Sequence, residues 1–93
     1  GYIYYLIGNH ETSLNLLLNA LTQLDLEDDL KVRANILKNI GFVYTEFKKY
    51  NRSLEYFNKA LNICLELELK ADISKIYYAI GDMYYLLNEY RNL

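Results

Sequence analysis

The sequence predicts an all-α protein in which antiparallel helix pairs stack into an α-solenoid. Three observations predict this fold: the 93 residues include no proline, apolar residues recur at helical spacing, and the chain resembles itself when shifted by 40 residues. Apolar residues make up 53% of the chain and charged residues 24%, which is the balance of a globular domain. A chain of this length forms one small domain.

The internal repeat is clearest at its glycines and rings. Three of the four glycines align in the 40-residue register, and tyrosines align in a second column. Self-similarity at a fixed period of this size is typical of stacked helical repeats. The aligned columns are Gly1, Gly41 and Gly81; Tyr4, Tyr44 and Tyr84; and the ring-bearing His10, Tyr50 and Tyr90.

The first two helices are expected over residues 1–8 and 11–25. Gly8-Asn9 separates them, because both residue types tolerate a left-handed turn, and Asn9 can also cap the second helix. The second helix shows a stripe on a 3.6-residue period, formed by Leu14, Leu17, Ala20, Leu21 and Leu24.

The third helix is expected over 29–47, with Glu27, Asp28 and Asp29 on the favourable side of its dipole. Gly41 falls in its middle, where glycine costs about 1 kcal/mol relative to alanine. We therefore expect a close approach of another helix there, with Ala60 as the partner. The apolar stripe of this helix is Ile36, Leu37, Ile40, Tyr44 and Phe47.

The fourth helix is expected over 51–67 and the fifth over 70–88. Lys48-Lys49 forms the turn before the fourth helix, and Asn51 is its expected cap. Cys64 lies on the stripe of the fourth helix and is expected to be a small buried apolar residue. Asn88-Glu89 should form the next turn, with a further stub from 91. The stripes are Leu54, Phe57, Ala60, Leu61 and Cys64, then Ile76, Tyr77, Ile80, Tyr84 and Leu87.

Several classes of function lack the residues that they need. A net charge of −2 argues against nucleic-acid binding through phosphates, and no apolar run is long enough to span a membrane. With one cysteine and one histidine, the chain has no internal disulfide and no Cys/His metal cage. His10 stands where Tyr50 and Tyr90 stand, so it is expected to fill a corner between helices. We therefore expect no enzyme, no cofactor and no metal, and a cytoplasmic location.

The residues Leu37, Ile40-Gly41, Tyr44, Tyr50, Ser53-Leu54, Phe57 and Ala60-Leu61 form one pattern of spacing. This pattern resembles the tetratricopeptide repeat. That resemblance implies a right-handed superhelix whose concave face is lined by the first helix of each repeat. The period of 40 exceeds the family's 34 and the closing proline is absent, as in a bacterial subset found in signalling proteins and peptide receptors.

The repeat register divides the chain into a partial repeat (1–33), a complete repeat (34–73) and a second partial repeat (74–93). The chain is expected to be a piece of a longer array. Residues of the first helices that lie off the packing stripes should face the groove. They are Tyr2, Tyr5, Leu6, Asn35, Lys38, Asn39, Phe42, Thr45, Lys75, Tyr78, Asp82 and Tyr85.

This aromatic wall with a few amides suits a peptide, because rings provide contact area and amides bond a backbone. The alternative is that the tyrosines only pack between neighbouring helices. Asn39 is the best polar candidate, and Asn39 and Lys75 are the two matches to the family's carboxylate clamp, too few to predict one. The sequence thus predicts a protein- or peptide-binding module. The alternative is a self-association scaffold that uses the poorly covered stripe Ile73–Leu87.

Overall fold

The computed structural model describes residues 10–23 and 29–91, with side chains through 89, and this part of the chain is all α-helical. The predicted helix over 1–8 lies outside the described residues. The other four predicted helices are present and begin within one residue of the expected positions. They are α2 (His10–Gln23), α3 (Leu30–Glu46), α4 (Tyr50–Glu66) and α5 (Lys70–Arg91).

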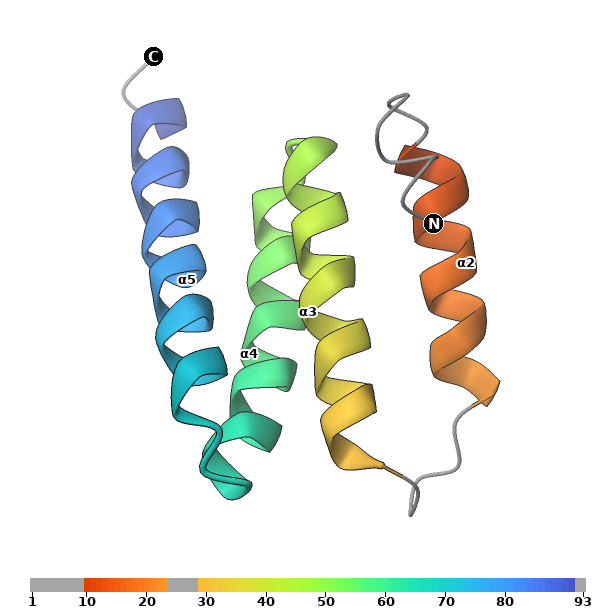
Figure 1. Ribbon diagram of the computed structural model, residues 1–93. Coiled ribbons are helices and arrows are strands. Elements are labelled where there is room, and N and C mark those ends of the chain that lie inside the picture. The colour runs from red at the N-terminus through yellow and green to blue at the C-terminus, as the bar shows by residue number, and fades with distance from the viewer. Residues whose placement is uncertain (1–9, 24–28, 92–93) are drawn as a thin grey trace.

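The helices stand side by side and alternate in direction (Figure 1). α3 packs against both α2 and α4, and α4 packs also against α5. α3 and α5 therefore run in the same direction on either side of α4, as first helices of successive repeats should. None of the described helices is long and apolar enough to cross a membrane.

The helix starts agree with the sequence at α3 but not at α4. The predicted acidic start of α3 includes Asp29, whose carboxylate accepts hydrogen bonds from the backbone N–H groups of Lys31 and Val32 and so caps the helix. The expectation that Asn51 caps α4 is wrong. Asn51 lies inside the first turn, and Lys49 occupies the cap position without a side-chain hydrogen bond.

Two short turns of the same geometry join the last three helices. Lys48 has φ 61° and Glu68 has φ 57°, both in the left-handed region. After each, a backbone N–H reaches back five residues, from Lys49 to the Tyr44 carbonyl at 2.9 Å and from residue 69 to the Cys64 carbonyl at 3.0 Å. These bonds satisfy carbonyls at the helix ends that would otherwise lack donors.

The turn expected at Asn88-Glu89 is absent. α5 continues through both residues to Arg91. Neither residue type stops a helix by itself, and no proline or glycine follows Gly81 in α5. The 40-residue register therefore predicts a turn at a position where the local sequence does not require one.

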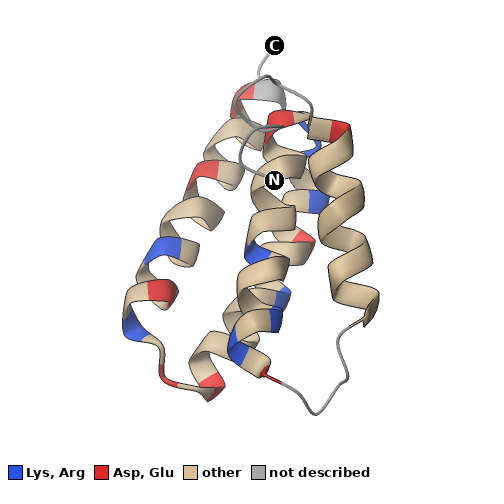
Figure 2. Cartoon of the chain, turned by 45° about the vertical axis from the view of Figure 1, so that its right-hand side comes forward, with Lys and Arg blue, Asp and Glu red and all other residues tan. Residues whose placement is uncertain are grey.

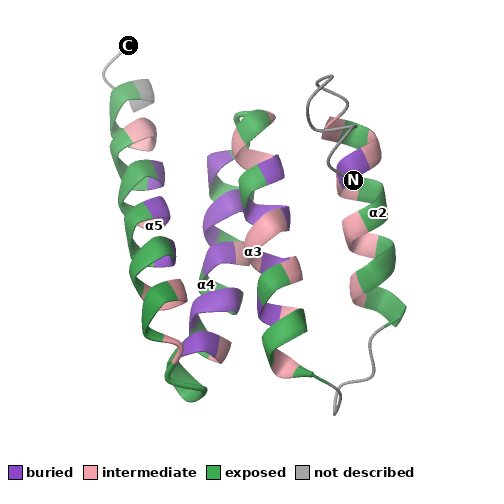
Figure 3. Ribbon diagram, viewed as in Figure 1, coloured by how far each residue is buried: buried purple, intermediate pink, exposed green. Residues whose placement is uncertain are grey.

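The core lies where α3, α4 and α5 meet (Figure 3). Ile40, Phe57 and Ile76, one from each helix, are fully buried, and Cys64 is buried as predicted. α2 is covered less well: Ser13 is its one residue classed as buried, although Leu21 packs against the core. His10, at the start of α2, lies edge-to-face on Phe47 at 6.0 Å, in a corner between helices.

Gly41 does sit at a close helix contact, but its expected partner was wrong. A Cβ built on Gly41 would lie 2.7 Å from Cε1 of Phe57, and the three nearest atoms all belong to that ring rather than to Ala60. A wide aromatic ring needs the absence of a Cβ more than a small residue does. The same reason does not apply at Gly81, whose Cβ would have no neighbour within 4 Å in the described structure.

α5 buries only part of the stripe that the 40-residue register suggests: Ile76 is buried and Ile80 and Leu87 pack against the core, but the two tyrosines do not. Ile76, Ala79 and Met83 are buried against α4. Tyr77 and Tyr84, placed on the packing stripe by the sequence, are 54% and 60% exposed. The corresponding face of α3 is covered by α4, whereas no described helix covers this face of α5.

Candidate functional site

The groove between α3 and α5 is the candidate site. A hollow of about 480 Å³ lies between these two helices, and its lining is mainly apolar. Five of the twelve predicted groove residues meet there, contributed by both helices. The lining residues are Lys38, Phe42, Ser74, Lys75, Tyr78, Ala79 and Asp82.

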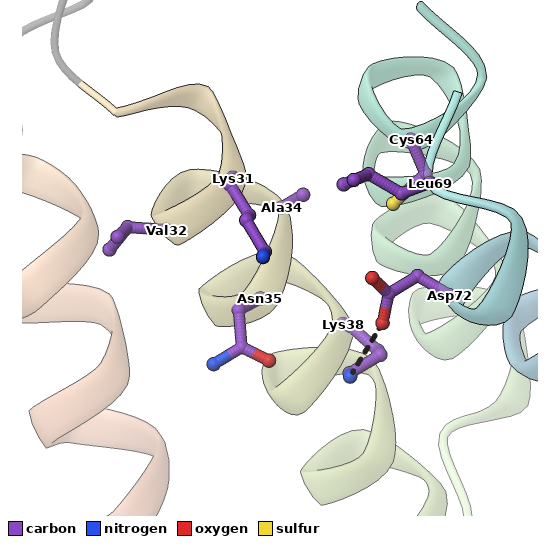
Figure 4. Close-up of a pocket in the computed structure, with 8 residues that line it drawn as sticks. All are labelled: Lys31, Val32, Ala34, Asn35, Lys38, Cys64, Leu69 and Asp72. Atoms are coloured by element: carbon purple, nitrogen blue, oxygen red, sulfur yellow. Dashed lines mark ion pairs between the residues drawn. The ribbon is translucent and has the colours of Figure 1, made fainter. Parts of the chain in front are cut away.

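A second hollow of about 240 Å³ continues this groove toward the start of α3 (Figure 4). It shares Lys38 with the first hollow and includes the predicted Asn35. Its floor includes Ala34, Cys64 and Leu69. The two hollows thus follow one side of α3 over about three turns, and we refer to them together as the α3/α5 groove.

An ion pair crosses the groove where the hollows join. Lys38 Nζ of α3 lies 3.7 Å from the carboxylate Oδ1 of Asp72 on α5, drawn dashed in Figure 4. Both side chains are largely or partly shielded from solvent, so this pair is screened less than an ordinary surface pair. It therefore links α3 directly to α5.

Two rings form the apolar part of the groove. Phe42 lies edge-to-face on the buried Phe57 ring, with centroids 5.0 Å apart and planes at 73°, yet Phe42 remains 43% exposed. This contact fixes the ring in place while leaving a face open. Tyr78, on the opposite wall, is 75% exposed. Rings positioned in advance lose little entropy when they bind a partner.

The remaining predicted groove residues differ in position. Thr45 is not a groove residue: its Oγ1 lies within 3.5 Å of the Gly41 carbonyl, Ser53 Oγ and Met83 Sδ. Asn39 is half-buried and Tyr85 is exposed, and neither lines the two hollows. Tyr2, Tyr5 and Leu6 lie outside the described residues.

The sequence argument missed Asp72, Ser74 and Ala79 as lining residues. Asp72 and Ser74 belong to the first two turns of α5, and Ala79 belongs to its buried face. The register gave no signal for Asp72, because it aligns Lys38 with Tyr78, and Asp82 lies nearer to that position than Asp72 does.

The groove shows no arrangement typical of catalysis or metal binding. Burial raises the pKa of the Cys64 thiol above its ordinary 9.0, with Asp72 acting in the same direction and Lys38 opposing it, so this thiol is a poor nucleophile near pH 7. Among the described residues, no three His, Cys, Asp or Glu side chains form a group that could hold a metal ion.

Charge on the helices is mixed. Residues of both signs occur on α3, α4 and α5 (Figure 2), and the described part of the chain shows no continuous basic face. Lys48, Lys49 and Arg52 form a small basic cluster at the turn between α3 and α4.

Comparison with protein families identifies the family to which the sequence is related. The tetratricopeptide repeat matches residues 1–66 and again residues 32–92, so the two matches together cover nearly the whole chain. The chain belongs to the tetratricopeptide repeat family. No curated protein and no solved structure gives a significant match.

Membership explains the arrangement of helices described above. In a tetratricopeptide array, α3 with α4 forms one repeat and α5 begins the next, so the α3/α5 groove lies between the first helices of successive repeats. Tetratricopeptide repeats generally mediate protein–protein interaction and are typically non-catalytic.

Proposed function

We propose that this tetratricopeptide array binds a peptide or protein segment in the α3/α5 groove. The exposed faces of Phe42 and Tyr78, which lie on opposite walls of one mainly apolar hollow, carry the proposal. Aromatic rings held apart by a scaffold offer apolar area to an incoming side chain. The contact with Phe57 supports the same proposal, because it positions the Phe42 ring at the groove and not inside the core.

An extended or helical segment is the kind of partner that fits. The groove follows α3 over about three turns, so it can contact several residues of a partner in succession. Asn35, exposed in the smaller hollow, can both donate to and accept from a peptide backbone. Asn39 stays a secondary candidate for the same role.

A random-peptide display library selected on the immobilised chain tests this proposal. Tyr78→Ala serves as the groove variant, because Tyr78 is largely exposed and its removal leaves the core intact. Tyr77→Ala is the matched control, since Tyr77 is the adjacent exposed ring and lines neither hollow. Peptides enriched on the wild-type chain should bind the Tyr77 variant equally and the Tyr78 variant at least about tenfold more weakly.

Two outcomes contradict groove binding. One is an enriched peptide set that binds all three chains alike, which would place the site elsewhere on the array. The other is a set that loses affinity for the Tyr77 variant alone. Circular dichroism of each variant before selection ensures that all three chains are folded.

We further propose that the array is the sensory or scaffolding part of a larger bacterial, cytoplasmic signalling protein. Support comes from the resemblance of its long, proline-free repeats to a bacterial subset of the family. The same resemblance supports dividing the chain into repeats at residues 33/34 and 73/74. The reading frame that flanks these 93 residues tests the proposal, because a signalling output domain beside the array is expected and a secreted or purely metabolic partner domain contradicts it.

Self-association is the second candidate function, and one specific observation favours it. Tyr77, Gly81 and Tyr84 lie on an exposed face of α5, although the corresponding face of α3 is covered by α4. Sedimentation velocity at rising protein concentration tests this candidate. Self-association predicts an increase in mass that Tyr84→Glu abolishes and Tyr78→Ala leaves unchanged, whereas a constant monomer mass contradicts it.

A further inference from the structure

We propose that the α3/α5 groove selects its partner by charge order, meaning opposite charges at the two ends: it takes an extended four-residue stretch with a carboxylate at the end beside Lys75, a cation at the end beside Asp82 and a bulky apolar side chain between them. The inference depends on the proposed function, because the groove must first bind a segment. It goes further by naming the chemistry of that segment and where each part lies.

The charges that remain available in the larger hollow define the two ends. Lys38 is already occupied by Asp72, 3.7 Å away. Lys75 and Asp82 line the same hollow, are exposed, and form no ion pair with any other described side chain. The hollow therefore offers one cation and one anion to a ligand, and a complementary ligand carries the opposite pair.

The spacing of these two charges fixes the length of the stretch. Lys75 and Asp82 are seven residues apart on α5, or about 10.5 Å along a helix that rises 1.5 Å per residue. An extended backbone advances about 3.3 Å per residue, so three steps cover the same distance. The complementary acid and base therefore belong at the first and fourth positions of a tetrad.

The aromatic walls fix the middle of the tetrad. Tyr78 lies three residues after Lys75 and four before Asp82, and Phe42 faces the same hollow from α3. Ala79 contributes only a methyl group to the lining, which leaves room for a large side chain. An apolar residue at the second or third position would fill this space between the rings.

Four capped, fluorescein-labelled peptides test the charge order by fluorescence anisotropy with the intact chain. Their central tetrads are Glu-Phe-Ala-Lys, Glu-Phe-Ala-Glu, Lys-Phe-Ala-Lys and Glu-Ala-Ala-Lys, each flanked by Gly-Ser. The first should bind up to about fivefold more tightly than either like-charged peptide, as exposed ion pairs allow. That advantage should vanish near 1 M salt, where the Debye length is about 3 Å. The peptide without phenylalanine should bind most weakly.

Charge reversal in the protein gives the sharper test. Lys75→Glu leaves the hollow with two anions, so the preferred peptide should become Lys-Phe-Ala-Lys. Asp82→Lys leaves two cations, so the preference should move to Glu-Phe-Ala-Glu. Lys70→Glu is the matched control, because Lys70 is an exposed lysine of α5 that lines neither hollow. It changes net charge equally and should leave the order of affinities intact.

The outcomes separate this inference from the proposed function. Equal affinity for all three phenylalanine peptides, lost in Tyr78→Ala, overturns charge order and supports groove binding. No measurable binding of any tetrad also overturns charge order, while the display selection still decides groove binding independently. A preference that moves equally in Lys70→Glu overturns the assignment to Lys75 and Asp82.

Discussion

The ring of Phe57 occupies the space in which a side chain on Gly41 would begin. A Cβ at position 41 would lie 2.7 Å from Cε1 of that ring, a distance that real Cβ atoms do not adopt. Phe57 is fully buried and also supports the exposed Phe42 of the groove. The absence of a side chain in the middle of α3 is therefore a requirement for the core and for the site built on it.

Gly41→Ala and Gly81→Ala should change stability in opposite directions. At Gly41, overpacking costs about 1–3 kcal/mol and outweighs the gain of about 1 kcal/mol in helix propensity. At Gly81 no atom opposes the new methyl group, so only the propensity gain of up to about 1 kcal/mol remains. Urea unfolding followed by circular dichroism measures both changes. Equal signs for the two variants would contradict the assigned contact.

A double variant isolates the role of the ring. Leucine is smaller than phenylalanine, so Phe57→Leu should relieve the clash created by Gly41→Ala. The cost of Gly41→Ala should then be smaller in the Phe57→Leu background than in the wild-type chain. Additive effects would mean that Phe57 is not what restricts position 41.

Phe57→Ala should destabilise the chain by about 3–5 kcal/mol. The ring is fully buried at the centre of the contact between α3 and α4, so its removal leaves a cavity. Tyr85→Ala is the control, since it removes an equally large ring from an exposed position and should change stability by less than about 0.5 kcal/mol. Comparable losses in both variants would show that the register of the core is wrong.

Stability should fall on the alkaline side. Burial raises the pKa of the Cys64 thiol above 9.0 and that of the Tyr56 phenol above 10.0. Both groups are neutral when protonated, so the folded chain retains its protons to higher pH than the unfolded chain. Their contribution is full below pH 9 and is lost as pH rises through the raised values. The urea midpoint should therefore decline above pH 9.

Two variants assign that decline. Cys64→Ala should flatten the first part of the profile and Tyr56→Phe the part above pH 10. A midpoint that stays constant between pH 7 and pH 11, or that falls identically in both variants and the wild-type chain, would rule out these two groups as its cause.

The Lys38–Asp72 pair should couple α3 to α5. A double-mutant cycle with Lys38→Met and Asp72→Asn, which keep the size of each side chain, should give a coupling energy of about 0.5–1 kcal/mol. Raising the salt concentration should reduce it only in part, because the pair is half-shielded. A coupling energy of zero in low salt would show that the two charges act independently.

Much of the fold follows from periodicity alone. Four described helices and the buried positions of Phe57, Cys64 and Ile40 follow from the 3.6-residue period and the repeat. Local chemistry predicts the acidic start of α3, at which Asp29 is the cap. The same kind of prediction fails at Asn51. A tight turn closed by hydrogen bonds to carbonyls at the end of α3 starts α4 one residue earlier than expected.

Periodicity does not predict which neighbouring helix covers which face of a helix. α5 is apolar on two sides, and periodicity cannot say which side meets α4; the structure buries Met83 and leaves Tyr84 exposed. Phe42 and Tyr78, which the sequence assigns to the groove, do line one hollow between the parallel first helices, and their role in binding stays a prediction. Thr45 was misassigned because its hydroxyl bonds depend on atoms that are distant in sequence.

The hydroxyl of Thr45 has a consequence for how the array unfolds. It lies 3.1 Å from Ser53 Oγ on α4 and 3.5 Å from Met83 Sδ on α5, so one atom of α3 contacts both of the following helices. Unfolding of α5 would therefore remove a contact partner of the preceding repeat, in addition to the contacts that α5 makes itself. Neighbouring units are therefore thermodynamically interdependent, and fraying from the C-terminal side should spread as a cooperative event rather than helix by helix.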